Sequence, residues 1–184
     1  MTLRRGVVLA VLVGGAVLAV VLLRTGGGDN PTVAHVGGQP IKRKQLEAVV
    51  DHFRLEAKAE GKPFPDESTE AFKRSRNQLL GLLVYRAELR QAAARLGVKV
   101  RPVEVVRRLQ ASGEPGEVNR DSFDYGSVET QLLYQRIFAR VTRGVTAPTT
   151  AELAARRNRA MSRFLARLKR ETEVRYEPGY APGP

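Results

Sequence analysis

Between residues 68 and 98, hydrophobic positions recur at helical spacing over a long stretch. Leu79 and Leu83 fall on one face of a helix, and apolar residues fill the remaining faces across Leu79–Val84. A helix that is apolar nearly all round cannot lie on the surface and needs partners on several sides. The pattern predicts a central helix over 68–98, closed by Gly97 in the left-handed conformation.

Shorter patterns on either side predict the elements that pack on this helix. A brief alternation over Val33–Ile41, turning at Gly37-Gly38, indicates a hairpin. Amphipathic helices are expected at 42–60, from Pro102 to about 110, at 127–141 and at 149–172, followed by a strand at 173–177. Together these predict a mainly α fold, a small domain of about five helices with a minor β element that pairs its two ends.

Three helix starts differ in the chemistry of their first residue. Ser127 and Thr149 can accept hydrogen bonds from free backbone N–H groups, and Thr149 stands three residues before Glu152, as in a capping box. Lys42 cannot accept such a bond, and Ser or Thr in its place would add about 1 kcal/mol. In the helix that starts at Pro102, Val103, Val106 and Leu109 are expected to face inward.

The first residues carry a separate hydrophobic signal. Arg4 and Arg5 precede an uninterrupted apolar run from Gly6 to Leu23, which as a helix would reach about 27 Å, close to the thickness of a membrane core. No small-x-small cleavage site follows the run, which favours an uncleaved transmembrane anchor over a signal peptide. The two arginines before the span favour a single-pass membrane protein whose body lies outside the cytoplasm.

These signals divide the 184-residue chain into four parts. Residues 1–24 are the expected transmembrane anchor and 25–32 a linker of turn-forming residues. Residues 33–177 form the helical domain. Residues 178–184, rich in Pro and Gly, are expected to be a flexible tail.

The chain is basic, with 31 Lys and Arg against 19 Asp and Glu, a net charge of +12. Part of the excess gathers on the outward face expected for the last helix: Arg156, Arg157, Arg159, Arg163, Arg167, Lys169 and Arg170. Such a face can contact anionic lipid headgroups or can simply be solvated. It has neither an aromatic platform nor a known nucleic-acid motif beside it, so a nucleic-acid partner is not expected.

Side chains suited to catalysis or metal binding are few. The chain has no cysteine, and its two histidines, His35 and His52, lie on a predicted strand and a predicted helix. Their spacing is not that of metal ligands, and no Ser/His/Asp arrangement can be assigned. We therefore expect no enzyme, no metal and no cofactor.

Several weak motifs occur in a specific order. Val33-Ala-x-Val-Gly-Gly-x-Pro-Ile leads into a helix, the long helix carries Leu79-Leu80-x-x-Leu83-Val84 and ends in Leu96-Gly97-Val98-x-Val100, and a helix follows from Pro102. Over roughly Val33 to Val141 this order resembles the N-terminal chaperone domain of the SurA-like and PrsA-like extracytoplasmic foldases (the trigger factor/SurA type). Lys42 departs from the family, which usually has Ser or Thr at that point.

The resemblance extends to the end of the chain. In the family, a last helix and strand return from beyond a parvulin-type prolyl isomerase domain and complete the N-terminal domain. Here 149–172 and Val174–Tyr176 resemble that returning segment, and only Thr142–Pro148 precedes it. The resemblance implies a chaperone core without its catalytic insert, with Val174–Tyr176 lying close to Val33–Val36.

The function implied is binding without turnover of unfolded or extended segments of exported proteins. A groove between helices would present large side chains to them, and burial of apolar surface would supply about 25 cal/mol per Å². The candidates for that groove are Phe53, Phe64, Phe72, Tyr85, Tyr134 and Phe138. Two alternatives stay open: a structural adaptor that docks one specific envelope partner, and a degenerate prolyl isomerase.

Overall fold

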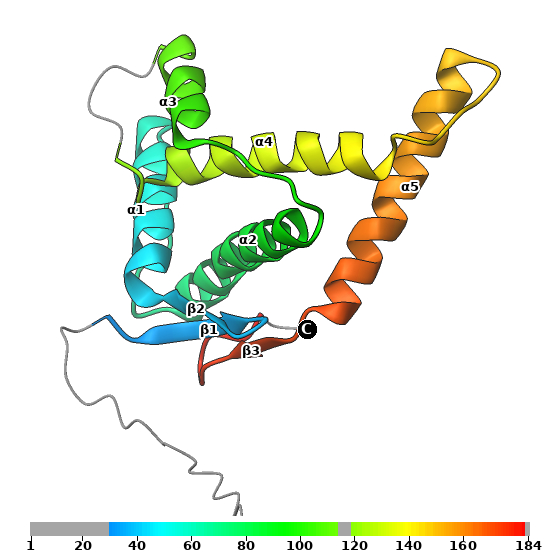
Figure 1. Cartoon of the computed structure of the whole chain (residues 1–184). Coiled ribbons are helices and arrows are strands. Elements are labelled where there is room, and N and C mark those ends of the chain that lie inside the picture. Colours follow the sequence, from blue (N-terminus) through cyan, green and yellow to red (C-terminus); the bar gives the residue numbers. More distant parts are fainter. Residues whose placement is uncertain (1–29, 114–118, 183–184) are drawn as a thin grey trace, which may run out of the picture.

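The computed structural model describes residues 30–113 and 119–182, which form a mainly helical domain of five helices and a small three-stranded sheet. Helix α2 (Glu70–Arg95) occupies the middle (Figure 1). Around it lie α1 (Arg43–Ala59), α4 (Phe123–Val141) and α5 (Thr150–Glu171), with the sheet along a further side. The predicted central helix is thus confirmed.

The sheet joins the two ends of the described chain. Strands β1 (Thr32–Val36) and β2 (Gln39–Lys42) form the predicted hairpin, with Gly37 and Gly38 at φ 52° and 81° in its turn. Strand β3 (Val174–Tyr176) pairs antiparallel with β1 on its other side, so the strand order is β2-β1-β3. This pairing confirms that the last strand returns to the first.

At the start of α1, residues that precede β1 accept the hydrogen bonds that the side chain of Lys42 cannot accept. The backbone N–H of Lys44 donates to the side-chain oxygen of Asn30 at 2.9 Å, and the N–H of Arg43 donates to the carbonyl of Pro31 at 2.8 Å. The N–H of Lys42 donates to the side chain of Gln45. The free N–H groups that Lys42 cannot satisfy are therefore met by the segment that enters β1.

Both ends of α2 are closed by local hydrogen bonds. The Thr69 hydroxyl accepts from the N–H of Phe72 at 3.1 Å. At the other end Gly97 has φ 66°, and the N–H of Val98 donates to the carbonyl of Ala93 at 2.8 Å. This is a Schellman motif with glycine in the left-handed position, as the sequence predicts.

The core is built along the two halves of α2. Leu80, Leu83 and Val84 pack with the sheet and α1, whereas Leu89, Ala92 and Ala93 pack with α4 and α5. The covered face therefore changes along the helix, and one side of its middle is left open. Leu82 is 41 % exposed and Tyr85 37 %, so the expectation that Leu79–Val84 is covered all round is wrong at Leu82.

Helix α3 (Pro102–Ala111) and the start of α4 differ from the predictions. Val105 and Leu109 face the core, but Val103, expected inward, is 51 % exposed because the buried stripe is shifted toward Val105. Helix α4 begins at Phe123, four residues earlier than expected, and its cap is Ser122 rather than Ser127: the Ser122 hydroxyl accepts from the N–H of Tyr125. The polar, glycine-containing sequence before Ser127 hides this first turn.

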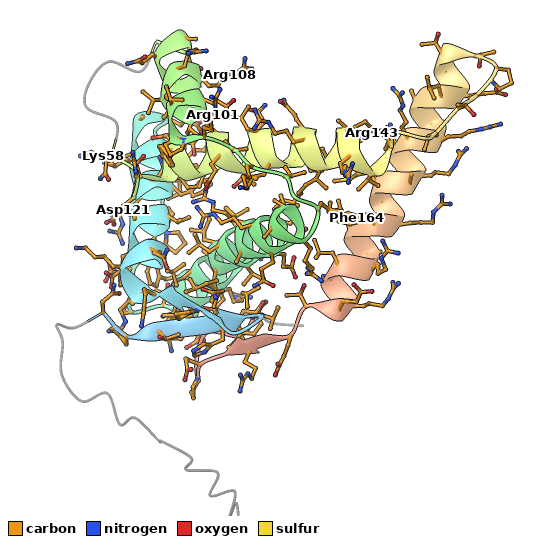
Figure 2. The ribbon with its side chains drawn as sticks, in the orientation of Figure 1. Lys58, Arg101, Arg108, Asp121, Arg143 and Phe164 are labelled. Carbon is orange, nitrogen blue, oxygen red and sulfur yellow. The ribbon has the colours of Figure 1, made fainter. Side chains whose placement is uncertain are left out.

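Helix α5 completes the second half of the core. It begins at the predicted cap, where the hydroxyl of Thr149 accepts from the N–H of Glu152 at 3.2 Å. Met161 and Leu168 are buried against Leu89 and Ile137, and Phe164 points toward the C-terminal end of α2 (Figure 2). The last helix therefore packs on the central helix, as the resemblance implies.

The residues after β3 are held on α2, although the sequence predicts a flexible tail from 178. Asn77, 8 % exposed, donates from its side chain to the carbonyls of Gly179 at 3.3 Å and Ala181 at 2.8 Å. The guanidinium of Arg76 lies 4.3 Å from the ring centroid of Tyr180. These bonds satisfy the buried side-chain amide of Asn77 and place residues 178–181 against α2. That residues 178–184 form a flexible tail stays a prediction.

Replacing Asn77 tests this anchor. We expect Asn77→Ala to lower the free energy of unfolding by about 1–3 kcal/mol, since the two hydrogen bonds that the buried Asn77 amide donates to Gly179 and Ala181 are lost. Urea denaturation measures that loss, and amide hydrogen exchange should speed up over 177–181. Gln78→Ala, at the neighbouring exposed position, should change neither. Unchanged exchange in Asn77→Ala would contradict the anchor.

No helix within residues 30–113 and 119–182 is long and apolar enough to cross a membrane. The predicted anchor at 1–24 and residues 25–29 of the predicted linker lie outside the described residues.

Candidate functional site

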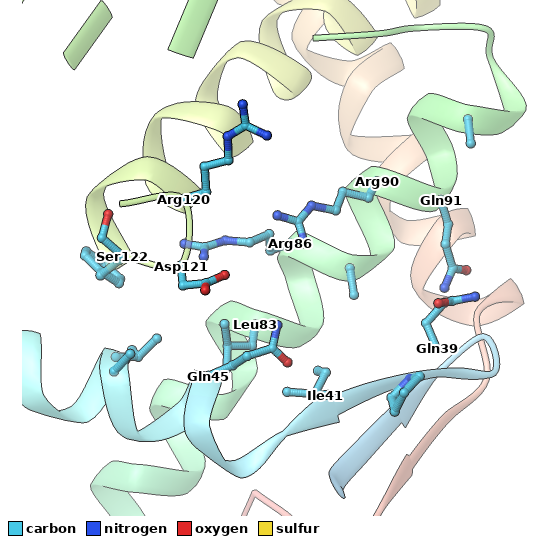
Figure 3. A pocket seen from close by; sticks show the side chains of 17 residues that line it. Gln39, Ile41, Gln45, Leu83, Arg86, Arg90, Gln91, Arg120, Asp121 and Ser122 are labelled. Atoms are coloured by element: carbon cyan, nitrogen blue, oxygen red, sulfur yellow. The ribbon is translucent and has the colours of Figure 1, made fainter. Parts of the chain in front are cut away.

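A pocket of about 490 Å³ lies where β2, α1, α2 and the start of α4 meet (Figure 3). Its floor is apolar: Ile41, Val49 and Leu83 are buried core residues whose side chains also face the pocket. Phe123 forms one wall. This volume is in the range of sites that hold small molecules or a few residues of a peptide.

The wall at Phe123 is fixed by aromatic packing. Its ring is stacked on His52 with centroids 4.1 Å apart and meets Phe53 edge-on at 5.2 Å. The Nδ1 atom of His52 lies 3.8 Å from a carboxylate oxygen of Asp124. Since these contacts join α1 to the first turn of α4, they hold the pocket open between two helices.

Polar side chains line the rim. Gln39, Gln45 and Gln91 stand on the side of the hairpin, and Arg86, Arg90, Arg120, Asp121 and Ser122 on the other (Figure 3). The Gln91 amide nitrogen donates to the carbonyl of Val36 at 2.6 Å, which ties the hairpin to α2. An apolar floor with amide and guanidinium groups above it suits an extended polypeptide, whose carbonyls need donors and whose side chains need apolar contact.

Arg86 is the most enclosed cation of the rim. Its Nε donates to the hydroxyl of Thr130 at 3.2 Å, and its guanidinium lies 5.9 Å from the Phe123 ring centroid. Burial, followed by the like charge of Arg90, lowers the pKa of Arg86, which nevertheless stays protonated at neutral pH. Arg90 is itself paired with Glu129 through Nε at 3.0 Å.

The six aromatic residues predicted for a client groove divide into two groups, and none of them lines this pocket. Phe53, Phe64 and Phe72 pack against the core beside the sheet, with the rings of Phe64 and Phe72 6.4 Å apart. Tyr134 and Phe138 are stacked 6.4 Å apart against the core beside α5. Tyr85 is near Tyr134: burial raises its pKa, and Tyr134 adds to the rise.

Sequence reasoning missed the residues that shape the pocket. Arg86 and Phe123 lie 37 positions apart along the chain, and nothing in their local pattern links them. Gly126, which the Arg86 guanidinium approaches in the structure, lies just before the helix that the sequence predicts from 127, so it gave no signal of this contact.

The sequence matches the family described as SurA-like N-terminal domain over residues 2–136, well over half of the chain. The chain belongs to this family. Among curated proteins, none matches it. The SurA-like N-terminal domain is a chaperone-type domain, distinct from the catalytic parvulin domain, so the chain has a chaperone-type role in general terms.

The matched region ends inside α4, so α5 and β3 of this SurA-like domain lie beyond it. The contacts of Met161 and Leu168 with α2 and the pairing of β3 with β1 nevertheless make both elements part of the same fold. The returning segment expected from the resemblance is thus present in the structure.

The basic face of α5 is narrower than predicted. Five exposed arginines share one stripe of the helix, spaced three or four residues apart: Arg156, Arg159, Arg163, Arg167 and Arg170. Figure 2 shows nitrogen-tipped side chains along this outer side of α5. Lys169 is exposed beside the stripe. Arg157 was expected to face outward, but it lies on the inward stripe and its Nε is buried without a hydrogen-bond partner.

Glu88 is a carboxylate on α2 with only 7 % of its surface exposed. Burial raises its pKa above the ordinary 4.5, and the charge of Lys169 offsets part of this rise. A raised pKa means that the contribution of Glu88 to stability is present in full below about pH 4.5 and is lost as pH rises through the folded-state value. The ionised form is therefore the destabilising one.

We expect Glu88→Gln to be more stable than the original protein at pH 7 and to lose this advantage at pH 3. Urea denaturation at the two pH values measures the difference. Glu56→Gln, at an exposed position of α1, serves as the control for a simple change of net charge. An equal effect of Glu88→Gln at both pH values would show that ionisation of Glu88 does not matter.

Proposed function

We propose that this SurA-like domain is a membrane-anchored, extracytoplasmic chaperone that binds extended segments of exported polypeptides without catalysis. The family supplies the chaperone-type role. The observation that carries the finer proposal is the pocket beside β2, with its buried apolar floor and a rim of amide and guanidinium groups. An extended segment can place side chains on Leu83 and Ile41 while its carbonyls meet donors on the rim.

Filling the pocket tests this proposal. Ala48 lines the pocket and is only partly exposed, so Ala48→Trp would occupy the space. The original protein is expected to suppress aggregation of several unrelated unfolded proteins, and Ala48→Trp is expected to lose most of that effect. Ala154→Trp, at an exposed position of α5, should retain it.

Two assays separate the alternatives. Suppression of aggregation by neither the original protein nor the control would favour an adaptor that docks one specific partner. Turnover in a separate isomerase assay with a proline-containing peptide would instead support a degenerate isomerase.

The location rests on the apolar run from Gly6 to Leu23 and the arginines before it. A topology reporter fused after Pro184 is expected to be active only outside the cytoplasm. Activity inside would remove the extracytoplasmic part of the proposal and leave peptide binding untouched.

The arginine stripe of α5 supports contact with the anionic headgroups of the same membrane, to which each cation near the surface contributes about 1 kcal/mol. We expect the protein to bind vesicles that contain anionic lipid more tightly than neutral vesicles, and the difference to shrink in high salt. Co-sedimentation of Arg159→Gln/Arg163→Gln should show weaker binding than Arg101→Gln/Arg108→Gln, which removes the same charge from the region of α3. Equal binding by the two double variants would exclude a role for the stripe.

A further inference from the structure

The pocket beside β2 is lined by more positively charged side chains than there are carboxylates to neutralise them. Arg86, Arg90 and Arg120 line it, and Asp121 is the one carboxylate among the described lining residues. Arg90 is neutralised by Glu129, which lies outside the lining. Among the described residues, no carboxylate forms an ion pair with Arg86 or Arg120.

Arg86 also keeps most of its donors unused. Its Nε is bound to Thr130, but no described group accepts from its two terminal nitrogens. The side chain points from α2 across the pocket toward the start of α4 (Figure 3). A guanidinium so placed offers two parallel N–H donors, the geometry that matches a carboxylate.

The position of this guanidinium depends on Gly126, in the first turn of α4. A Cβ atom at residue 126 would lie 1.8 Å from a terminal nitrogen of Arg86 and 2.3 Å from its central carbon. Any other residue would push the end of Arg86 aside. The fold therefore accepts a glycine in a helix, where alanine is favoured, and the arginine reaches the pocket.

Because its floor is apolar, the pocket is not suited to a small free anion alone. Ile41, Leu83 and Ala87 line the same pocket as the guanidinium, so whatever binds must bring apolar groups together with its negative charge. An extended polypeptide with a carboxylate next to apolar side chains meets both demands.

We propose that Arg86 binds a carboxylate of the client segment, so that this pocket selects extended polypeptides in which an acidic group adjoins apolar residues. The inference rests on the proposed function and names its substrate class. The carboxylate can be an Asp or Glu side chain or the C-terminus of the client. Arg120 adds a second cation at the exposed rim.

Three labelled octapeptides of one apolar sequence test the proposal by fluorescence anisotropy with the full chain. The first has a central Asp and an amidated end, the second a central Asn and a free carboxyl end, and the third a central Asn and an amidated end. At least one of the first two should bind about tenfold to a hundredfold more tightly than the third, as expected for a charged hydrogen-bonded pair. Which of them does so identifies the source of the carboxylate.

Variants test whether Arg86 causes the tighter binding of peptides that carry a carboxylate. Arg86→Gln should abolish the difference between the peptides and Gly126→Ala should reduce it; the second keeps the arginine, shifts the end of its flexible side chain and favours the helix. Arg159→Gln removes the same charge from exposed α5 and should keep the difference. Equal binding of all three peptides by the original protein, or a preference retained in Arg86→Gln, would overturn the inference and leave the proposed function standing. Binding of none of the three would overturn both.

Discussion

A chain that ends at residue 149 is expected to lose cooperative unfolding. Such a truncation removes α5 and β3, and with them Met161 and Leu168, which cover Leu89 and Ile137 in the second half of the core. Loss of each large buried side chain costs about 2–5 kcal/mol. Because the whole stability of a domain is about 5–15 kcal/mol, losing both residues, about 4–10 kcal/mol together, and the pairing of β3 with β1 should remove most or all of it.

Thermal and urea denaturation followed by circular dichroism check this expectation. The truncated chain should show helical signal without a sharp transition and should bind a dye specific for exposed apolar surface. A chain that ends at Pro182 keeps every contact described for Asn77 and should unfold like the original. A cooperative transition of similar midpoint in the truncated chain would mean that residues 30–149 fold by themselves.

Leu80→Ala is expected to lower the free energy of unfolding by about 2–5 kcal/mol. Leu80 is fully buried in the half of the core that joins α2 to the sheet and α1. Its removal leaves a cavity among side chains from three elements, and these can close it only in part. Urea denaturation gives the difference, with an unchanged dependence on urea concentration if the folded state is otherwise the same.

Leu82→Ala is the matched control, two residues along the same helix. Leu82 is 41 % exposed, so its truncation should change stability by about 0.5 kcal/mol or less. The sequence pattern assigns the two leucines the same environment, and only the structure separates them. A loss in Leu82→Ala as large as that in Leu80→Ala would mean that a partner covers this side of α2 in solution.

The order and kind of the elements could be predicted because each depends on neighbours along the chain. Helical spacing, the Gly37-Gly38 turn, the Thr149 cap and the closing Gly97 act within a few residues, and all are found in the structure. Predictions failed where local signals conflict with packing. Ser127 satisfies the rule for a cap, yet Ser122 is used because burial of Tyr125 requires one more helical turn.

The candidate site could not be predicted in the same way. The sequence indicates six aromatic residues by size alone, and in the structure five of them pack on the two core clusters. The pocket instead combines residues of β2, α1, α2 and α4, which no local pattern relates. A small helical domain uses most of its large side chains for its own interior. A binding surface therefore forms from the remaining side chains where helices and strands meet.

The sequence by itself determined the helices, the hairpin and their order, because hydrophobic spacing and turn chemistry are short-range, and its resemblance to the SurA-like family implied that the last strand returns to the first. Only the tertiary structure decided that Asn30 caps α1, that Asn77 holds residues 178–181, and that Arg86 faces an apolar pocket beside Gly126. Each of these contacts joins groups far apart in the chain. Such groups find one another only after burial of the core has fixed the helices in place.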